Sequence, residues 1–116
     1  MARRTPKNTR KHRRATVRIL VDYQARGAIH CDYATTLGAG GMFLQTEIEM
    51  QRGESVKVRF RVPGGECLHE LEARGTWYHA AQQQPNGSLR MPGVGLQFVD
   101  PTATATLARE LEELAE

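Results

Sequence analysis

The sequence predicts a mostly β protein in which six antiparallel strands form a barrel and one helix follows them. Short segments of alternating apolar and polar residues recur along the chain, and turns rich in Gly and Pro separate them. An amphipathic helical pattern is found only after residue 100. Short strands joined by tight turns and followed by a single helix are typical of a small antiparallel barrel.

The first two predicted strands form a hairpin. Over 17–23, the side chains of Val17, Ile19, Val21 and Tyr23 share one face at period two, which is the pattern of a strand. A turn at 24–27 returns the chain through a second strand at 28–36. This strand leads directly into a glycine-rich segment.

That glycine-rich segment, at 36–41, reads Thr36-Leu37-Gly38-Ala39-Gly40-Gly41 and precedes a short strand at 42–46. Glycine has no Cβ, so backbone N–H groups can approach a ligand closely and positive φ is accessible without strain. The segment is therefore either a tight hairpin or an anion-binding site. Its spacing alone favours the hairpin.

Three further strands are predicted after a turn at 51–54. In the strand at 55–62, valines and Phe60 alternate with Lys57, Arg59 and Arg61, which predicts one buried face and one solvated, cationic face. A turn at 63–66 leads to the strand at 68–78. The polar stretch at 80–92 is predicted to be a mobile loop, and the last strand, at 93–99, directs Val94, Leu96 and Phe98 inward.

The terminal helix is predicted over 101–115, with Asp100 as its N-cap and Pro101 as its first residue. Leu107, Leu111 and Leu114 form one apolar stripe, which would cover an open barrel end or meet a partner protein. The acidic residues of this helix are predicted to face outward.

Charge divides the chain into a basic flexible arm at 1–15 and a barrel domain with its helix at 16–116. The first 14 residues hold 7 of the 16 Lys and Arg residues and none of the 13 acids. Such a segment repels itself and should be disordered unless an anion binds it. Candidate anions are nucleic acid, an acidic lipid surface, and a small phosphorylated ligand held by Arg10, Arg13 and Arg14.

Several functional classes are not supported by any motif. The chain has no apolar run that would make a membrane span or secretory signal, so a cytoplasmic location is expected. Cys31 and Cys67 match no zinc spacing and are predicted to be packing thiols. The four histidines are scattered and no nucleophile motif is present, which predicts neither a metal site nor an enzyme.

Nucleic-acid binding is disfavoured for a different reason. Barrels that bind single strands stack bases on exposed aromatic side chains. Aromatic residues make up only 6% of this chain, and most of them are predicted to occupy inward registers. The residues concerned are Tyr23, Phe43, Phe60, Trp77 and Phe98.

The order of the basic and glycine motifs resembles the PilZ domain family. The resemblance rests on Arg10-xxx-Arg14 before the first strand, the glycine turn ending at Gly41, a strand with Gly75 and Trp77, and a closing Gly93-x-Gly95-x-x-Phe98 strand. It extends from Arg10 to about Leu111. In that family the domain is a six-stranded barrel with a C-terminal helix, and many members bind the bacterial second messenger cyclic di-GMP.

The resemblance implies a site for this ligand. Arg10 and Arg14 match the two arginines that clamp phosphate and contact guanine, a task that suits a planar fork of donors. Gly41 matches the closing glycine of the second motif. Thr36, however, stands at the position of an Asp or Asn, and Gly38 at the position of a Ser. Two weaker or missing polar contacts would lower affinity about 10- to 100-fold.

Three functions follow as hypotheses. The first is a bacterial receptor that binds cyclic di-GMP and passes the signal to an unidentified effector protein, for example in motility or secretion, with no cofactor beyond that ligand. The second is a degenerate PilZ adaptor that has lost the nucleotide and acts by protein contact. The third is nonspecific nucleic-acid binding by the arm, for which affinity would fall steeply with salt.

Overall fold

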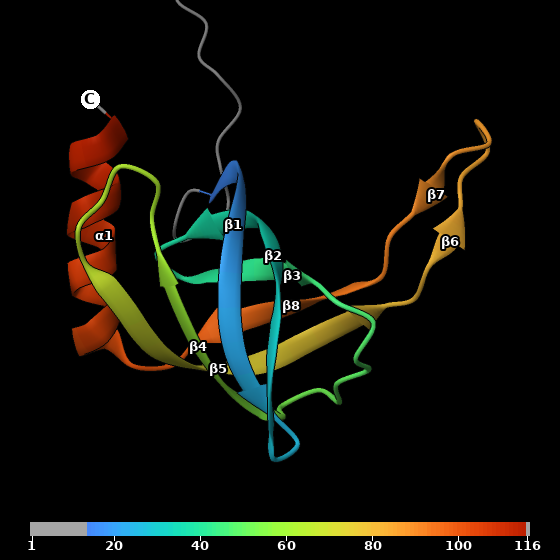
Figure 1. Ribbon diagram of the computed structural model, residues 1–116, viewed down its shortest axis with the longest axis horizontal. Helices are drawn as coiled ribbons and strands as arrows, with labels where there is room; N and C mark the ends of the chain where they lie inside the picture. Colours follow the sequence, from blue (N-terminus) through green and yellow to red (C-terminus); the bar gives the residue numbers. More distant parts are fainter. Residues whose placement is uncertain (1–13, 116) are drawn as a thin grey trace, which may run out of the picture.

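The computed structural model describes residues 14–115, with side chains for residues 17–114, and it forms a closed antiparallel barrel with a C-terminal helix (Figure 1). Around the barrel the strand order is β1-β2-β3-β8-β5-β4. The predicted fold class is therefore confirmed. The barrel strands are β1 (Arg14–Ala25), β2 (Ala28–Gly38), β3 (Gly41–Gln45), β4 (Ser55–Arg61), β5 (Leu68–His79) and β8 (Gly93–Phe98).

Most strand ends lie within one or two residues of the predicted bounds, and β1 differs most. It begins at Arg14, inside the segment assigned to the arm, and continues to Ala25. The β1–β2 turn is confined to Arg26 and Gly27, which both have positive φ. A two-residue turn of this kind matches the twist of the paired strands, so β1 extends two residues further toward the turn than the sequence pattern indicates, whereas β2 begins at Ala28 as predicted.

The stretch at 80–92 is not a loop without secondary structure, and that prediction was wrong. It contains a two-stranded ribbon of β6 (Gln82–Gln83) and β7 (Leu89–Arg90), closed by a hydrogen bond from the Gln84 N–H to the Ser88 carbonyl at 2.7 Å. β5 and β8 are paired up to His79 and Gly93, and the ribbon continues from them, projecting away from the barrel on the side opposite α1 (Figure 1). Backbone hydrogen bonds stabilise this hairpin, and its strand residues are all exposed, so its sequence shows no alternation of apolar and polar side chains.

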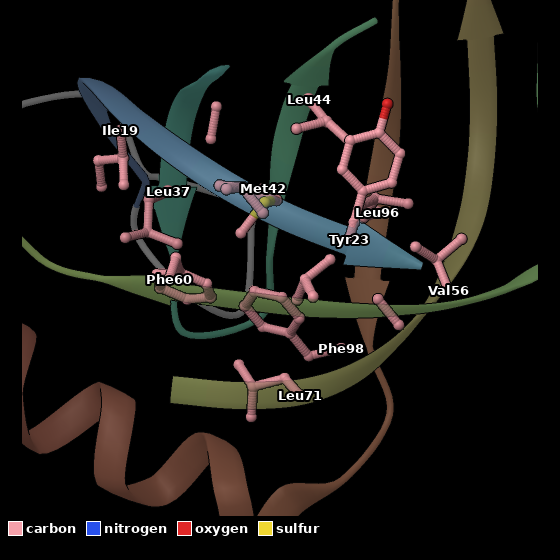
Figure 2. Packing of buried hydrophobic residues seen from close by; sticks show 14 of the residues in the cluster. Ile19, Tyr23, Leu37, Met42, Leu44, Val56, Phe60, Leu71, Leu96 and Phe98 are labelled. Carbon is pink, nitrogen blue, oxygen red and sulfur yellow. The ribbon is translucent and has the colours of Figure 1, made fainter. Parts of the chain in front are cut away.

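The barrel interior contains the apolar residues that alternate along each strand (Figure 2). β4 shows strict alternation, with Val56, Val58 and Phe60 buried and the cationic residues between them exposed. On the last strand, Val94, Leu96 and Phe98 are buried as predicted. The strand pattern is thus set by burial of one face.

The helix α1 (Pro101–Ala115) begins as predicted, because the Asp100 carboxylate accepts the N–H of Thr102 at 3.0 Å. Its leucine stripe mainly covers the barrel. Leu107 is fully buried and Leu111 is half-buried, so these two side chains are occupied within the chain, whereas Leu114 remains 42% exposed.

One acidic residue of α1 contradicts the expectation that they all face outward. Glu110 is buried, and its carboxylate contacts His69 Nε2 at 2.5 Å and accepts the backbone N–H groups of Glu66 and Cys67. These bonds tie the helix to the segment that opens β5. The hydrogen bond from His69, followed by those from the backbone, holds the pKa of Glu110 below its ordinary value.

This lowered pKa predicts a pH-dependent contribution to stability. A carboxylate with a folded-state pKa below its ordinary value of 4.5 stabilises the fold above that pH, and the contribution is lost as the pH falls further. Glu110→Gln should lower the free energy of unfolding by about 1–3 kcal/mol at pH 7 and by much less near pH 3. Urea unfolding at both pH values measures the difference. Glu112→Gln, an exposed change on the same helix, is the matched control, and an equal loss in the two variants would contradict the assignment.

The two cysteines are free thiols, but both are exposed rather than packed in the core, so their predicted role as packing residues was wrong. Cys31 lies in β2 on the solvent side of the sheet, and Cys67 lies in the segment before β5. Their polarity is compatible with either face of a strand, which is why the residue type alone did not place them.

Candidate functional site

The glycine-rich segment forms the hairpin between β2 and β3. Gly38 and Gly41 pair across its base, and the Phe98 N–H donates to the Gly40 carbonyl at 3.0 Å. The positive-φ glycines in the described chain lie at other turns, so this hairpin does not use the left-handed conformation. Gly41 is required for another reason: a Cβ there would overlap the Leu96 carbonyl oxygen, because β3 and β8 approach closely.

Strand pairing brings the start of β1 to this hairpin. The backbone of Arg14 lies opposite Gly38, and Thr16 lies opposite Thr36. Two predicted site residues that are 24 positions apart in sequence, Arg14 and Gly38, are therefore neighbours in the sheet. Arg10 and Arg13, the other predicted arginines, lie outside the described residues, as does the side chain of Arg14.

Thr36 occupies the edge of this region and its hydroxyl is already used. Its Oγ1 accepts the Phe43 N–H at 3.2 Å, next to a register shift between Ala34 and Thr36. The hydroxyl thereby accepts a backbone donor beside this irregular pairing. One lone pair and the O–H of Thr36 remain for a ligand.

A row of directly paired residues crosses four strands from Thr36. Phe43 of β3 lies opposite Thr36, Gly95 of β8 lies opposite Phe43, and Trp77 of β5 lies opposite Gly95. Directly paired residues share one face of a sheet. The aromatic side chains of Phe43 and Trp77 therefore come from either side of Gly95. The Thr76 hydroxyl covers this glycine, because its Oγ1 donates to the Gly95 carbonyl at 3.0 Å and would lie 2.6 Å from a Cβ there.

Trp77 corrects the expectation that the aromatic residues face inward. Its side chain is 59% exposed, because a register shift between Gly75 and Trp77 inserts one residue and reverses the alternation. Tyr78 packs against the core instead. The Arg52 guanidinium lies 5.6 Å from the Trp77 ring centre, so one face of the indole carries a cation.

The neighbouring row adds polar groups that the sequence patterns did not single out. Gln97 is opposite Gly41, and Arg74 is opposite Gln97, so this row runs from Arg14 through Gly38 and Gly41 to Arg74. Gln97 and Arg74 are exposed. Only the strand register reveals this set, because no motif spacing connects β1, β2, β3, β8 and β5.

The resulting face combines three glycines, Gly38, Gly41 and Gly95, with an exposed indole and at least one guanidinium at its rim. A planar, anionic ligand suits such a surface, since bases stack on indole and phosphates pair with guanidinium groups. Among the described side chains, no group of three or more His, Cys, Asp and Glu residues could hold a metal ion.

Fold and site define a class of protein, a small six-stranded antiparallel barrel with a C-terminal helix, in which the start of β1 pairs beside the β2–β3 hairpin. The family model that matches the sequence is the PilZ domain, over residues 8–116. The chain therefore belongs to the PilZ domain family, a family of cyclic di-GMP receptors.

Solved structures agree with this fold. The inhibitor of motility MotI/DgrA from Bacillus subtilis is similar over 94% of this chain, with 16% identity and a TM-score of 0.72, and the chain spans 52% of that protein. The PilZ domain of YcgR from Escherichia coli, solved with cyclic di-GMP, gives 14% identity and a TM-score of 0.66 over 93% of this chain and 95% of that domain.

A third similar structure is the PilZ domain of CeSA from a cellulose-synthesizing bacterium, with 19% identity and a TM-score of 0.58 over 86% of this chain and 98% of that domain. No curated protein sequence matches this chain significantly. PilZ domains are receptor and adaptor domains rather than enzymes. Within the described residues, no helix is both long and apolar enough to cross a bilayer.

Proposed function

We propose that this chain is a cyclic di-GMP receptor that binds the nucleotide beside the β2–β3 hairpin and passes the signal to an effector protein in a bacterial cytoplasm. The observation that carries the proposal is the strand register, because it brings the backbone of Arg14 opposite Gly38. A basic segment that is continuous with β1 can thereby reach the face that contains Thr36, Gly41 and Trp77.

Each part of the ligand has a complementary group on this face. The phosphates are anionic and suit Arg10, Arg13 and Arg14, which follow one another in the basic segment. Guanine has a planar π-face that suits the exposed indole of Trp77, and N–H donors at its edge that suit the Thr36 oxygen. Binding would order the arm over the barrel and create the surface that an effector contacts.

Titration with cyclic di-GMP tests the proposal directly. Trp77 is the only tryptophan in the chain, so its fluorescence reports on this face alone. We expect calorimetric heat together with a change in Trp77 emission, and amide NMR shifts concentrated at 36–43, 74–77 and 95–97. The absence of heat at about tens of micromolar protein in low salt would refute the proposal, because a weak micromolar complex is still detected there.

The departures from the family motif yield a gain-of-affinity prediction. In Thr36→Asp with Gly38→Ser, one carboxylate oxygen can accept the Phe43 N–H and the other remains for the guanine edge. Since Gly38 is not among the positive-φ glycines, its backbone conformation permits a serine. We expect cyclic di-GMP affinity to rise about 10- to 100-fold by calorimetry. Unchanged affinity in a stably folded double variant would mean that these positions do not limit binding.

A second candidate function is a PilZ adaptor that acts by protein contact without the nucleotide. It is favoured by the Thr36 hydroxyl, which is already engaged by Phe43 N–H, and by Gly38, which has no side chain to offer. Binding of an effector with equal affinity in the presence and absence of cyclic di-GMP would favour this function. Neither candidate requires nucleic acid, and a steep fall of nucleic-acid affinity with salt would instead identify nonspecific binding by the arm.

A further inference from the structure

The strands β1 and β4 separate along part of their length and leave a hollow in the outer wall. They pair only from Asp22 to Gln24 with Lys57 to Arg59, although both strands continue beyond Asp22 and Arg59. The space between them measures about 630 Å³. We call it the seam hollow, and its lining includes Arg18, Leu20, Arg61, Pro63, Gly65 and Leu68.

Two cations in the seam hollow have no carboxylate within ion-pairing distance among the described side chains. The ion pairs among all described side chains are Arg26–Glu54, Arg59–Glu70 and His69–Glu110. Arg18 and Arg61 therefore take part in none of them. Both are nevertheless held in place. The Arg18 guanidinium lies 4.1 Å from the Tyr33 ring centre, and Arg61 Nη1 donates to the Glu66 carbonyl at 2.8 Å.

Apolar side chains accompany these cations. Leu20 is 54% exposed and Leu68 is 46% exposed, and both line the seam hollow. Exposed leucines beside ordered, unpaired guanidinium groups favour a partner surface that combines carboxylates with an apolar side chain.

The end of α1 has that complementary chemistry. Glu113 is exposed and forms no ion pair among the described side chains, and the next residue, Leu114, is 42% exposed. We call these two residues the helix end. The end of α1 lies beside the turn that follows β4 (Figure 1), and a Cβ at Gly64 in this turn would lie 3.5 Å from Leu114 Cδ2. The neighbouring residues Pro63 and Gly65 line the seam hollow.

The basic seam hollow and the acidic helix end thus lie on opposite sides of the exposed turn at Pro63 and Gly64. In a two-fold dimer both copies use the same surface patch. The basic part of the patch on one copy must therefore contact the acidic part of the patch on the other copy. A two-fold axis near this turn would place the helix end of one copy on the seam hollow of the other, twice. We propose that the chain forms this isologous homodimer, with Arg18 and Arg61 facing Glu113 and with Leu114 between Leu20 and Leu68.

The experiment is a charge exchange followed by sedimentation equilibrium from about 10 to about 500 µM protein, a range chosen because a small polar interface gives a weak dimer. Wild-type protein should dimerise. Arg61→Glu and Glu113→Arg should each weaken the dimer at least about tenfold, because the like-charge contact occurs twice. An equimolar mixture of the two variants should dimerise again, since both contacts are then between opposite charges.

Arg90→Glu, a reversal of the same size on the β6–β7 ribbon, is the control and should leave the association constant unchanged. Circular dichroism confirms that each variant is folded, as expected for exposed positions. A wild-type protein that stays monomeric at the highest concentration would overturn the proposal. The proposal would also be overturned if either single variant dimerised as tightly as the wild type, or if the equimolar mixture stayed monomeric. The proposal does not depend on cyclic di-GMP, so the ligand titration is decided separately.

Discussion

Arg14→Ala should abolish detectable binding of cyclic di-GMP while leaving the thermal midpoint nearly unchanged. A guanidinium that pairs bidentately with phosphate makes two charge-assisted hydrogen bonds, each of about 1.5–3 kcal/mol, so their loss lowers affinity by about 100-fold or more. The backbone pairing of Arg14 with Gly38 survives the change, because alanine has the same N–H and C=O groups. Calorimetry and thermal unfolding of the same sample measure both effects.

Two comparisons make this experiment specific. Arg14→Lys retains the charge but loses the planar fork, so an affinity between those of wild type and Arg14→Ala is expected if geometry contributes. Arg90→Ala removes an exposed arginine from the distant ribbon and should leave binding intact. If Arg14→Ala lowers the midpoint by several degrees and keeps its affinity, the residue is structural, and its aliphatic stem packs on the barrel.

Gly41→Ala should be the most destabilising single change at the candidate site. Its Cβ would overlap the Leu96 carbonyl oxygen and crowd the Gln97 Cα at 3.3 Å, and both are backbone atoms of a paired strand. The β3–β8 pairing must then separate, which costs about 3 kcal/mol or more and lowers the midpoint by at least about 10 °C in a domain of this size. Urea unfolding measures the free energy and calorimetry the midpoint.

Gly53→Ala provides the matched control for this prediction. Gly53 has a φ of +84°, and no atom lies within 4 Å of the position that a Cβ would take, so alanine there meets backbone strain without overlap. Its expected cost is about 1–2 kcal/mol. Equal losses in the two variants would show that conformational strain, and not the close approach of β3 to β8, explains the requirement for Gly41.

The strands and the helix were predictable because burial on one face leaves a period in the sequence. The alternation of Val56, Val58 and Phe60 with charged residues corresponds to the observed burial of β4. Asp100 and Pro101 likewise placed the start of α1 within one residue, since capping is a local interaction. The β6–β7 ribbon could not be found in this way, because it is held by backbone pairing and buries neither face.

The candidate site was only partly accessible to sequence patterns. Arg10, Arg14, Thr36, Gly38 and Gly41 were selected by their resemblance to a family motif, and Arg13 by its place in the basic segment. Trp77 was assigned to the interior, because one inserted residue reverses a strand's alternation without changing its composition. Arg74 and Gln97 had no signal, since they join the site through pairing between distant strands.

The sequence by itself determined the fold class, the helix start, the segregation of positive charge before β1 and the family to which the chain belongs, because each depends on local periodicity or on a motif in fixed order. Only the tertiary structure decided which residues share a face with the hairpin, that Glu110 is buried against His69, and that Arg18 and Arg61 line one hollow. These relations depend on strand register and on packing between segments 40 or more residues apart, such as His69 and Glu110. These relations arise when the barrel closes, and no local sequence pattern predicts how it closes.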